Sequence, residues 1–147
     1  MFIYNYPIPL IANGDPEKHL PHFINGIKKL ESIGVDFIVM PCNSAHYFYE
    51  SMKKEVSIPF FNIMEETLKK IKLRGYKKVG LLATETTVKY KLYDNILEYD
   101  GIKVIIPENQ EKVNEIVLNI LAGKKLEEDK NELIQITKEM IKKVQKQ

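Results

Sequence analysis

The chain has 147 residues, an apolar fraction of 44%, a charged fraction of 29% and a net charge of +2, values that are ordinary for one globular domain or two very small ones. The sequence shows neither an apolar run long enough for a membrane span nor the pattern of a signal peptide. Arg74 is the sole arginine among 22 lysine and arginine residues. This lysine-rich, nearly balanced composition predicts a solvated surface that binds neither nucleic acid nor membrane. A single cysteine excludes an internal disulfide and favours a reducing, cytoplasmic setting.

Apolar runs alternate with helical apolar spacing along the whole chain. The runs predict strands at residues 2–5, 35–40, 58–63, 78–84 and 102–106. The helical spacing predicts helices at residues 16–34, 45–54, 65–74, 88–99, 113–123 and 127–147. This alternation predicts an α/β fold with parallel sheets, in which the strand carboxyl ends share one ligand-binding edge. We expect a boundary near residue 75, with residues 1–75 forming a first lobe and residues 76–147 a partial second lobe.

The first polar strand end carries Cys42, which follows the predicted strand at residues 35–40. Asn43 or Ser44 can cap the helix expected after it, so the thiol is placed beside a helix amino terminus. Free backbone N–H groups and the helix dipole favour the thiolate there, which makes the sulfur a candidate nucleophile or base. The alternative is that Cys42 is a small buried apolar residue, as free cysteines often are.

The second polar strand end carries Thr84-Glu85-Thr86-Thr87, which follows an apolar run. Small hydroxyl residues at a strand-to-helix turn bind anions through O–H and backbone N–H groups. The alternative is that Thr84 or Thr86 only caps the next helix. We expect the two polar strand ends to belong to one site.

Residues 41–46, Pro-Cys-Asn-Ser-Ala-His, resemble the first cysteine motif of the aspartate/glutamate racemase family, which usually reads Pro-Cys-Asn-Thr-Ala. Residues 81–87, Leu-Leu-Ala-Thr-Glu-Thr-Thr, resemble the second substrate loop of that family. Further similar segments occur in the same order at residues 34–40, 58–59, 63–67 and 101–107. The resemblance extends from about residue 5 to residue 123.

The resemblance implies racemisation of an acidic amino acid, aspartate or glutamate, without pyridoxal phosphate or another cofactor and without a metal. In the family, one cysteine thiolate removes the α-proton and a second thiol protonates the opposite face. Cys42 would be one of these two groups. The residues implied in substrate binding are Asn5, Asn43, Ser44, Thr84 and Thr87.

The second cysteine of the family lies in a later Gly-Cys-Thr-Glu motif, which this sequence lacks, as it lacks the family's opening strand. We therefore expect a family member truncated at both ends, with an α/β fold incomplete relative to the two-domain family fold. Exposed sheet edges and helix faces would then be covered by a homodimer or by a partner chain. Two alternative functions remain: a non-catalytic remnant that binds a small carboxylate or assembles with a partner, and a single-cysteine lyase or decarboxylase.

Other chemistries fit the sequence less well. His46 could form a thiol–imidazole pair with Cys42, but it lies a full helical turn away and has no evident orienting partner. A cysteine phosphatase would need an arginine soon after Cys42. His19, His22 and His46 do not have the spacing of zinc ligands, and we expect the first two at the surface of a helix.

Overall fold

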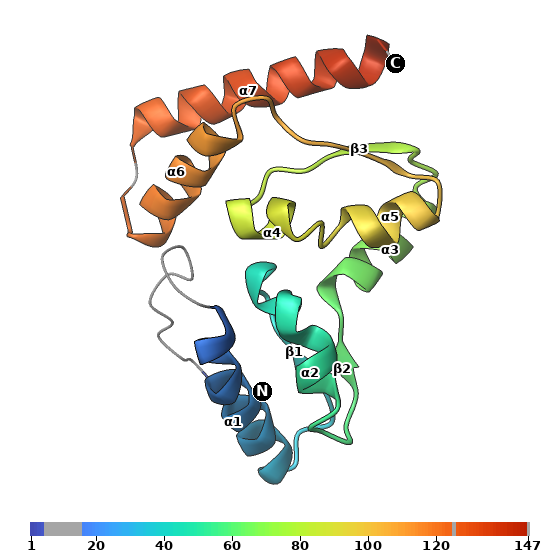
Figure 1. Ribbon diagram of the computed structural model, residues 1–147, viewed down its shortest axis with the longest axis vertical. Coiled ribbons are helices and arrows are strands. Elements are labelled where there is room, and N and C mark those ends of the chain that lie inside the picture. The colour runs from blue at the N-terminus through green and yellow to red at the C-terminus, as the bar shows by residue number, and fades with distance from the viewer. Residues whose placement is uncertain (5–15, 125, 147) are drawn as a thin grey trace. The chain divides into compact units, whose positions relative to one another are not determined.

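The computed structural model describes residues 1–4, 16–124 and 126–146 (Figure 1). It divides into two compact units, Met1–Thr67 and Leu68–Gln147. Each unit contains helices and a short parallel sheet, so the predicted α/β class is confirmed. The division falls inside α3 (Ile63–Leu73), whereas the sequence placed it near residue 75. The assignment of the two racemase-like lobes stays a prediction.

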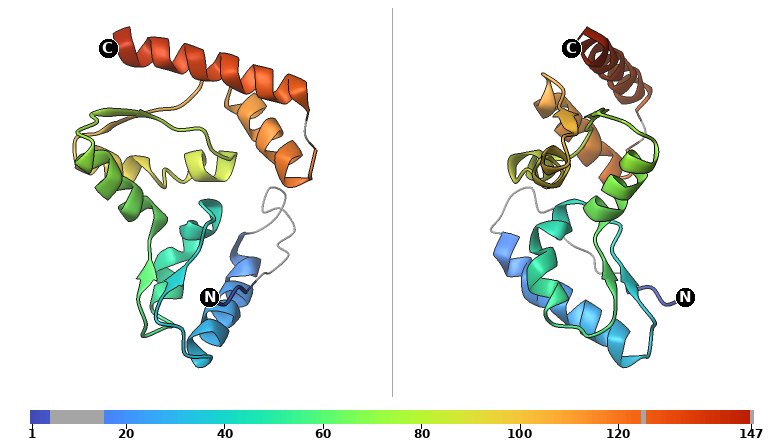
Figure 2. Two further views of the ribbon diagram at one scale, coloured as in Figure 1. Left: turned by 180° about the vertical axis from the view of Figure 1, so that it is seen from behind. Right: turned by 90° about the vertical axis from the view of Figure 1, so that its right-hand side faces the viewer.

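The first unit is built from a sheet of β1 (Ile38–Val39) and β2 (Phe60–Phe61), which pair in parallel with Ile38 opposite Phe60. The helical elements before β2 are η2 (Pro16–His19), α1 (Leu20–Ser32), η3 (Ser44–Phe48) and α2 (Tyr49–Lys53). Figure 2 shows α1 and α2 on the same side of the strands. Successive strand residues alternate between the two faces of a sheet. Ile38 and Phe60 are therefore buried beneath the helices, whereas Val39 and Phe61 are exposed.

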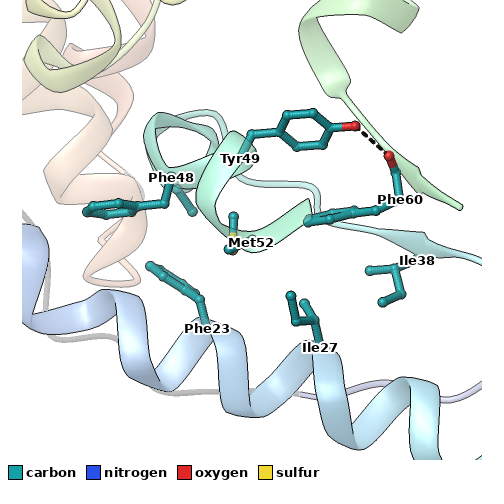
Figure 3. Packing of buried hydrophobic residues seen from close by; sticks show 8 residues of the cluster. Phe23, Ile27, Ile38, Phe48, Tyr49, Met52 and Phe60 are labelled. Atoms are coloured by element: carbon teal, nitrogen blue, oxygen red, sulfur yellow. Dashed lines mark hydrogen bonds between the residues drawn. The ribbon is translucent and has the colours of Figure 1, made fainter. Parts of the chain in front are cut away.

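The core of this unit is an apolar cluster between α1, α2 and the sheet (Figure 3). Phe23 and Ile27 point from α1 toward Met52 of α2, which is completely buried. The hydroxyl of Tyr49 donates a 2.6 Å hydrogen bond to the backbone oxygen of Phe60, which joins α2 to β2. Because Met40 and Cys42 pack against this cluster, the core directly supports the chain after β1.

The second unit contains β3 (Lys78–Gly80) and β4 (Lys103–Ile105), which pair in parallel. Besides the end of α3, its helices are α4 (Glu85–Lys89), α5 (Asp94–Tyr99), α6 (Gln110–Leu121) and α7 (Glu127–Lys146). Figures 1 and 2 show α7 running along β3. A Cβ atom at Gly80 would lie 3.1 Å from the Met140 Cε atom, so glycine allows this close approach. Met140 and Ile136 of α7 are buried with Val113 of α6.

Several predicted elements differ in extent. Within the described residues the strands are two or three residues long, shorter than the sequence indicated. The predicted strand at residues 2–5 is not formed over residues 1–4, and Asn5 lies outside the described residues. The helix predicted at residues 45–54 is instead a 3₁₀ segment, η3, followed by the single-turn α2.

The helix predicted at residues 88–99 is split into α4 and α5 at Lys91, whose φ is +50°. The N–H of Leu92 donates to the Thr87 oxygen and that of Lys91 to the Val88 oxygen. These two hydrogen bonds form a Schellman motif, which ends α4 with Lys91 in the left-handed position that glycine normally occupies.

Candidate functional site

Cys42 lies two residues beyond the end of β1 and is partly buried. Its N–H donates a 2.8 Å hydrogen bond to the Met40 oxygen. This bond closes a three-residue turn around Pro41, whose ring fixes its φ angle. Because Ile38 of β1 is in the apolar core and Met40 and Cys42 pack against it, the backbone that carries the thiol is supported by that core.

Asn43 and Ser44 follow directly and are also partly buried. Asn43 occupies the N-cap position of η3, but its side chain makes no capping hydrogen bond there, so of the two predicted capping residues, Asn43 and Ser44, the structure does not support Asn43. Its backbone is in the helical region, and its carbonyl accepts a 3.0 Å hydrogen bond from the His46 N–H. The first turn after Cys42 is therefore a 3₁₀ turn, and the regular α-helical bonding expected there begins only with α2.

His46 connects the Cys42 segment to two other elements. Its side chain is 3% exposed, and its ring stacks on Tyr49 with a centroid separation of 5.7 Å. The ring Nδ1 atom lies 2.8 Å from the Cys42 backbone oxygen, and the Nε2 atom lies 3.2 Å from the Ile63 nitrogen. Burial lowers the pKa of His46, although backbone carbonyls at Cys42 and Phe61 partly offset this effect. The sequence indicated no orienting partner for His46, and the structure supplies one on each side of its ring.

Thr84 and Thr87 form the second part of the candidate site, after β3 in the second unit. Thr84 occupies the N-cap position of α4 without a side-chain capping hydrogen bond. Its Oγ1 atom instead lies 3.1 Å from that of Thr87, which is completely buried. The alternative that Thr84 serves only as a side-chain cap is therefore not supported.

Two amide side chains of α6 hold the backbone on either side of Thr84. The Nε2 atom of Gln110 donates a 2.8 Å hydrogen bond to the Ala83 oxygen, and the Oδ1 atom of Asn114 accepts a 3.0 Å bond from the Glu85 N–H. Residues four apart share one face of a helix, so both amides reach the same loop. Neither residue stands out in the sequence. Their spacing of four indicates a shared helix face, but the loop that they bind lies more than twenty residues away in the sequence.

The structure brings Cys42, Asn43 and Ser44 together in the first unit, and Thr84 and Thr87 together in the second. The meeting of these two groups in one site stays a prediction, and Asn5 lies outside the described residues. Among the described residues, there is no group of three or more histidine, cysteine or acidic side chains that could hold a metal ion. A cavity of about 530 Å³ between α6 and α7 has a mostly apolar surface, although its lining residues include lysine and acidic side chains as well as isoleucine and leucine. None of the described candidate residues lines it.

Over the described parts of the chain, no helix combines the length and apolar character needed to cross a membrane. The described elements, with polar loops after β1 and β3, are those of an α/β protein, the class in which ligands bind at strand carboxyl ends. Comparisons with known proteins identify the family more closely.

The sequence profile of the Asp/Glu/hydantoin racemase family matches residues 8–146. The broad specificity amino-acid racemase RacX of Bacillus subtilis (strain 168) is 38% identical over 123 residues, which are 82% of this chain and 54% of that protein. The glutamate racemase of Aquifex pyrophilus is 40% identical over 77 residues, which are 51% of this chain and 30% of that protein.

Solved structures give the same result. An Asp/Glu racemase structure from Yersinia pestis matches with a TM-score of 0.76 and 28% identity, over 91% of this chain and 60% of that one. An aspartate racemase homologue from Pyrococcus horikoshii OT3 matches with a TM-score of 0.65 and 30% identity, over 81% of this chain and 56% of that one. The chain belongs to the Asp/Glu/hydantoin racemase family. The matched part of the chain spans about half the length of RacX and less than a third of the glutamate racemase.

Proposed function

We propose that this chain takes part in the cofactor-independent racemisation of an acidic amino acid of the aspartate or glutamate type, with Cys42 as one proton-transfer group. The observation that carries the proposal is the place of Cys42: partly buried after β1, on a turn closed by its own N–H, with its carbonyl bound to His46. The match to amino-acid racemases supports the reaction class. The single cysteine also supports a cytoplasmic setting.

In the proposed reaction, the Cys42 thiolate removes the α-proton of the amino acid and becomes a thiol. The electron pair of the C–H bond moves into the substrate carboxylate as an enolate. Donors from Asn43 and Ser44, on the same loop as Cys42, would stabilise that charge, since fixed hydrogen-bond donors act most strongly where charge develops. Thr84 and Thr87 stay substrate-binding residues by family resemblance. Proton return to the opposite face completes the inversion. Cys42 is the only cysteine in the sequence, so we assign that second transfer to another group or to water.

The test is to incubate the protein with L- or D-aspartate and with L- or D-glutamate in D₂O. Proton NMR then measures deuterium uptake at the α-carbon, and chiral chromatography measures inversion. Exchange with inversion is the expected result. Exchange with retention would instead indicate one-thiol chemistry of the lyase or decarboxylase kind. If the wild type and a Cys42→Ser variant both show no exchange, the remnant alternative is correct and the protein only binds a carboxylate or assembles with a partner.

We also propose that the chain assembles with a second copy of itself or with a partner chain. This is supported by the outer face of the β1–β2 sheet, where Phe37, Val39 and Phe61 are 54%, 62% and 42% exposed. The Phe37 and Phe61 rings contact each other edge to face, with a centroid separation of 5.5 Å. Parallel sheets are normally covered on both faces. Size-exclusion chromatography with light scattering tests the proposal. A monomer that does not bind an apolar dye would contradict it.

A further inference from the structure

We infer that His46 is a positioning residue, which fixes the backbone of Cys42 through its Nδ1 atom; this inference rests on the function proposed above. The basis is one short contact between a buried imidazole and the carbonyl of the candidate catalytic residue. His46 is not placed in the reaction itself, because both of its ring nitrogens are bound to backbone groups.

The hydrogen bonds of the ring to Cys42 and to Ile63 indicate which ring nitrogen carries the proton. A backbone carbonyl can only accept, so Nδ1 must be the N–H that donates to the Cys42 oxygen. A backbone N–H can only donate, so Nε2 must offer its lone pair to Ile63. With Nε2 accepting from Ile63 the imidazole is neutral, which is the form that burial favours by lowering its pKa; the carbonyls of Cys42 and Phe61 offset part of that lowering.

The 3₁₀ turn explains why a side chain is needed at this point. In a regular α-helix the His46 N–H would bind the Cys42 oxygen four residues earlier. Here that N–H binds Asn43 instead, and the imidazole of the same residue takes the Cys42 oxygen. The bond restrains the torsion angle between the α-carbon and carbonyl carbon of Cys42. It thereby fixes the peptide unit that ends at the Asn43 N–H.

The other end of the ring is anchored on α3. The Ile63 N–H is one of the first amides of that helix, which have no partner within the helix itself. Asn62 accepts hydrogen bonds from the next two amides, those of Met64 and Glu65, and His46 accepts the one from Ile63. Stacking on Tyr49 holds the ring plane. The Cys42 carbonyl is thus connected through one rigid ring to the start of α3.

Two substitutions separate the two ring contacts. The amide nitrogen of His46→Asn can replace the Nδ1 donor and keep the bond to Cys42. The longer side chain of His46→Gln can place its oxygen near Nε2 and keep the bond to Ile63 instead. Tyr49→Phe is the matched control, since it removes a buried hydrogen bond in the same core without touching Cys42. Urea unfolding establishes that each variant is folded under assay conditions.

We expect His46→Gln to lower kcat for α-proton exchange by about 10–100-fold with little change in KM, because small misplacement of a reacting group has effects of that size. His46→Asn and Tyr49→Phe should stay within about threefold of wild type, on the scale of a partly retained contact. The alkylation rate of Cys42 by iodoacetamide, measured without substrate, should change in His46→Gln and be retained in His46→Asn. If His46 matters only as a link to α3, the alkylation rate should instead change in His46→Asn and be retained in His46→Gln. That result, or equal alkylation rates in the two variants, would overturn the inference.

The alkylation series needs no substrate, so it separates this inference from the proposed function. Absence of exchange in the wild type would contradict the function, and the order of alkylation rates would still decide whether His46 acts on Cys42. If the variants do not fold, nitrogen-15 NMR of the wild-type histidine rings gives the answer. A His46 proton on Nδ1 supports the inference, and one on Nε2 overturns it.

Discussion

Met52 gives the sharpest prediction about the structure that supports Cys42. It is 0% exposed and lies in the core between α1 and the sheet, where Phe23 and Ile27 point toward it (Figure 3). Full burial of a methionine side chain is worth about 1.5–3 kcal/mol. Met52→Ala loses that transfer energy and adds the cost of a cavity, so we expect the free energy of unfolding to fall by about 2–5 kcal/mol.

Urea unfolding followed by circular dichroism measures this loss. Met52→Leu conserves volume and should cost less than about 1.5 kcal/mol. Ser51→Ala changes an exposed residue of the same helix and should stay within about 0.5 kcal/mol of wild type. A Met52→Ala loss below about 1 kcal/mol, or one equal to that of Met52→Leu, would refute the reasoning, since it would mean that the cluster beneath Cys42 is not tightly packed.

Three further predictions concern the polar contacts. Because burial lowers the pKa of His46, its imidazole is protonated below about pH 6.5 in the unfolded chain but stays neutral to lower pH in the folded chain. The free energy of unfolding should therefore fall as the pH drops through that range, by at most about 1.4 kcal/mol per pH unit. Urea midpoints measured at several pH values test this, and the midpoint of His46→Asn should decline less than that of the wild type. Thr87→Val removes the hydrogen bond to Thr84 and should lower the free energy of unfolding of the second unit by about 0.5–1.5 kcal/mol. Thr87→Ser keeps the hydroxyl and should preserve substrate affinity, measured by calorimetry. Asn114→Ala frees the Glu85 N–H and should speed its hydrogen exchange in NMR, while the free energy of unfolding should fall by no more than about 1 kcal/mol; an unchanged exchange rate would contradict the contact.

The fold was predictable where burial has a regular period. Phe23 and Ile27 are spaced one helical turn apart and are both buried in α1, as expected. The α/β class followed from the alternation of such helices with apolar runs. The strands proved shorter because hydrogen-bonded pairing, which sequence does not report, covers only part of each run.

Local breaks in the helices were not predictable in the same way. Lys91 ends α4 in a left-handed conformation, and a lysine gives none of the signal that a glycine gives there. The 3₁₀ turn after Cys42 also lacks a distinct pattern, because Asn43 and Ser44 are equally typical of an α-helical start.

Residues that support the candidate site were harder to find than residues within it. Cys42, Thr84 and Thr87 stood out as polar or reactive residues directly after apolar strands. His46 and Asn114 act through backbone groups that lie far away in the sequence or depend on an unusual turn. Their roles come from tertiary structure, which single-sequence periodicity does not encode.

The measurement that tests the central proposal most directly is the loss of the α-proton NMR signal of aspartate and glutamate in D₂O, in wild type and Cys42→Ala side by side. We predict measurable exchange in the wild type and a rate at least about 100-fold lower in the variant, the range expected when a proton-transfer group is removed. Equal exchange rates in the two proteins, with both shown to be folded, would contradict the assignment of Cys42 as a proton-transfer residue.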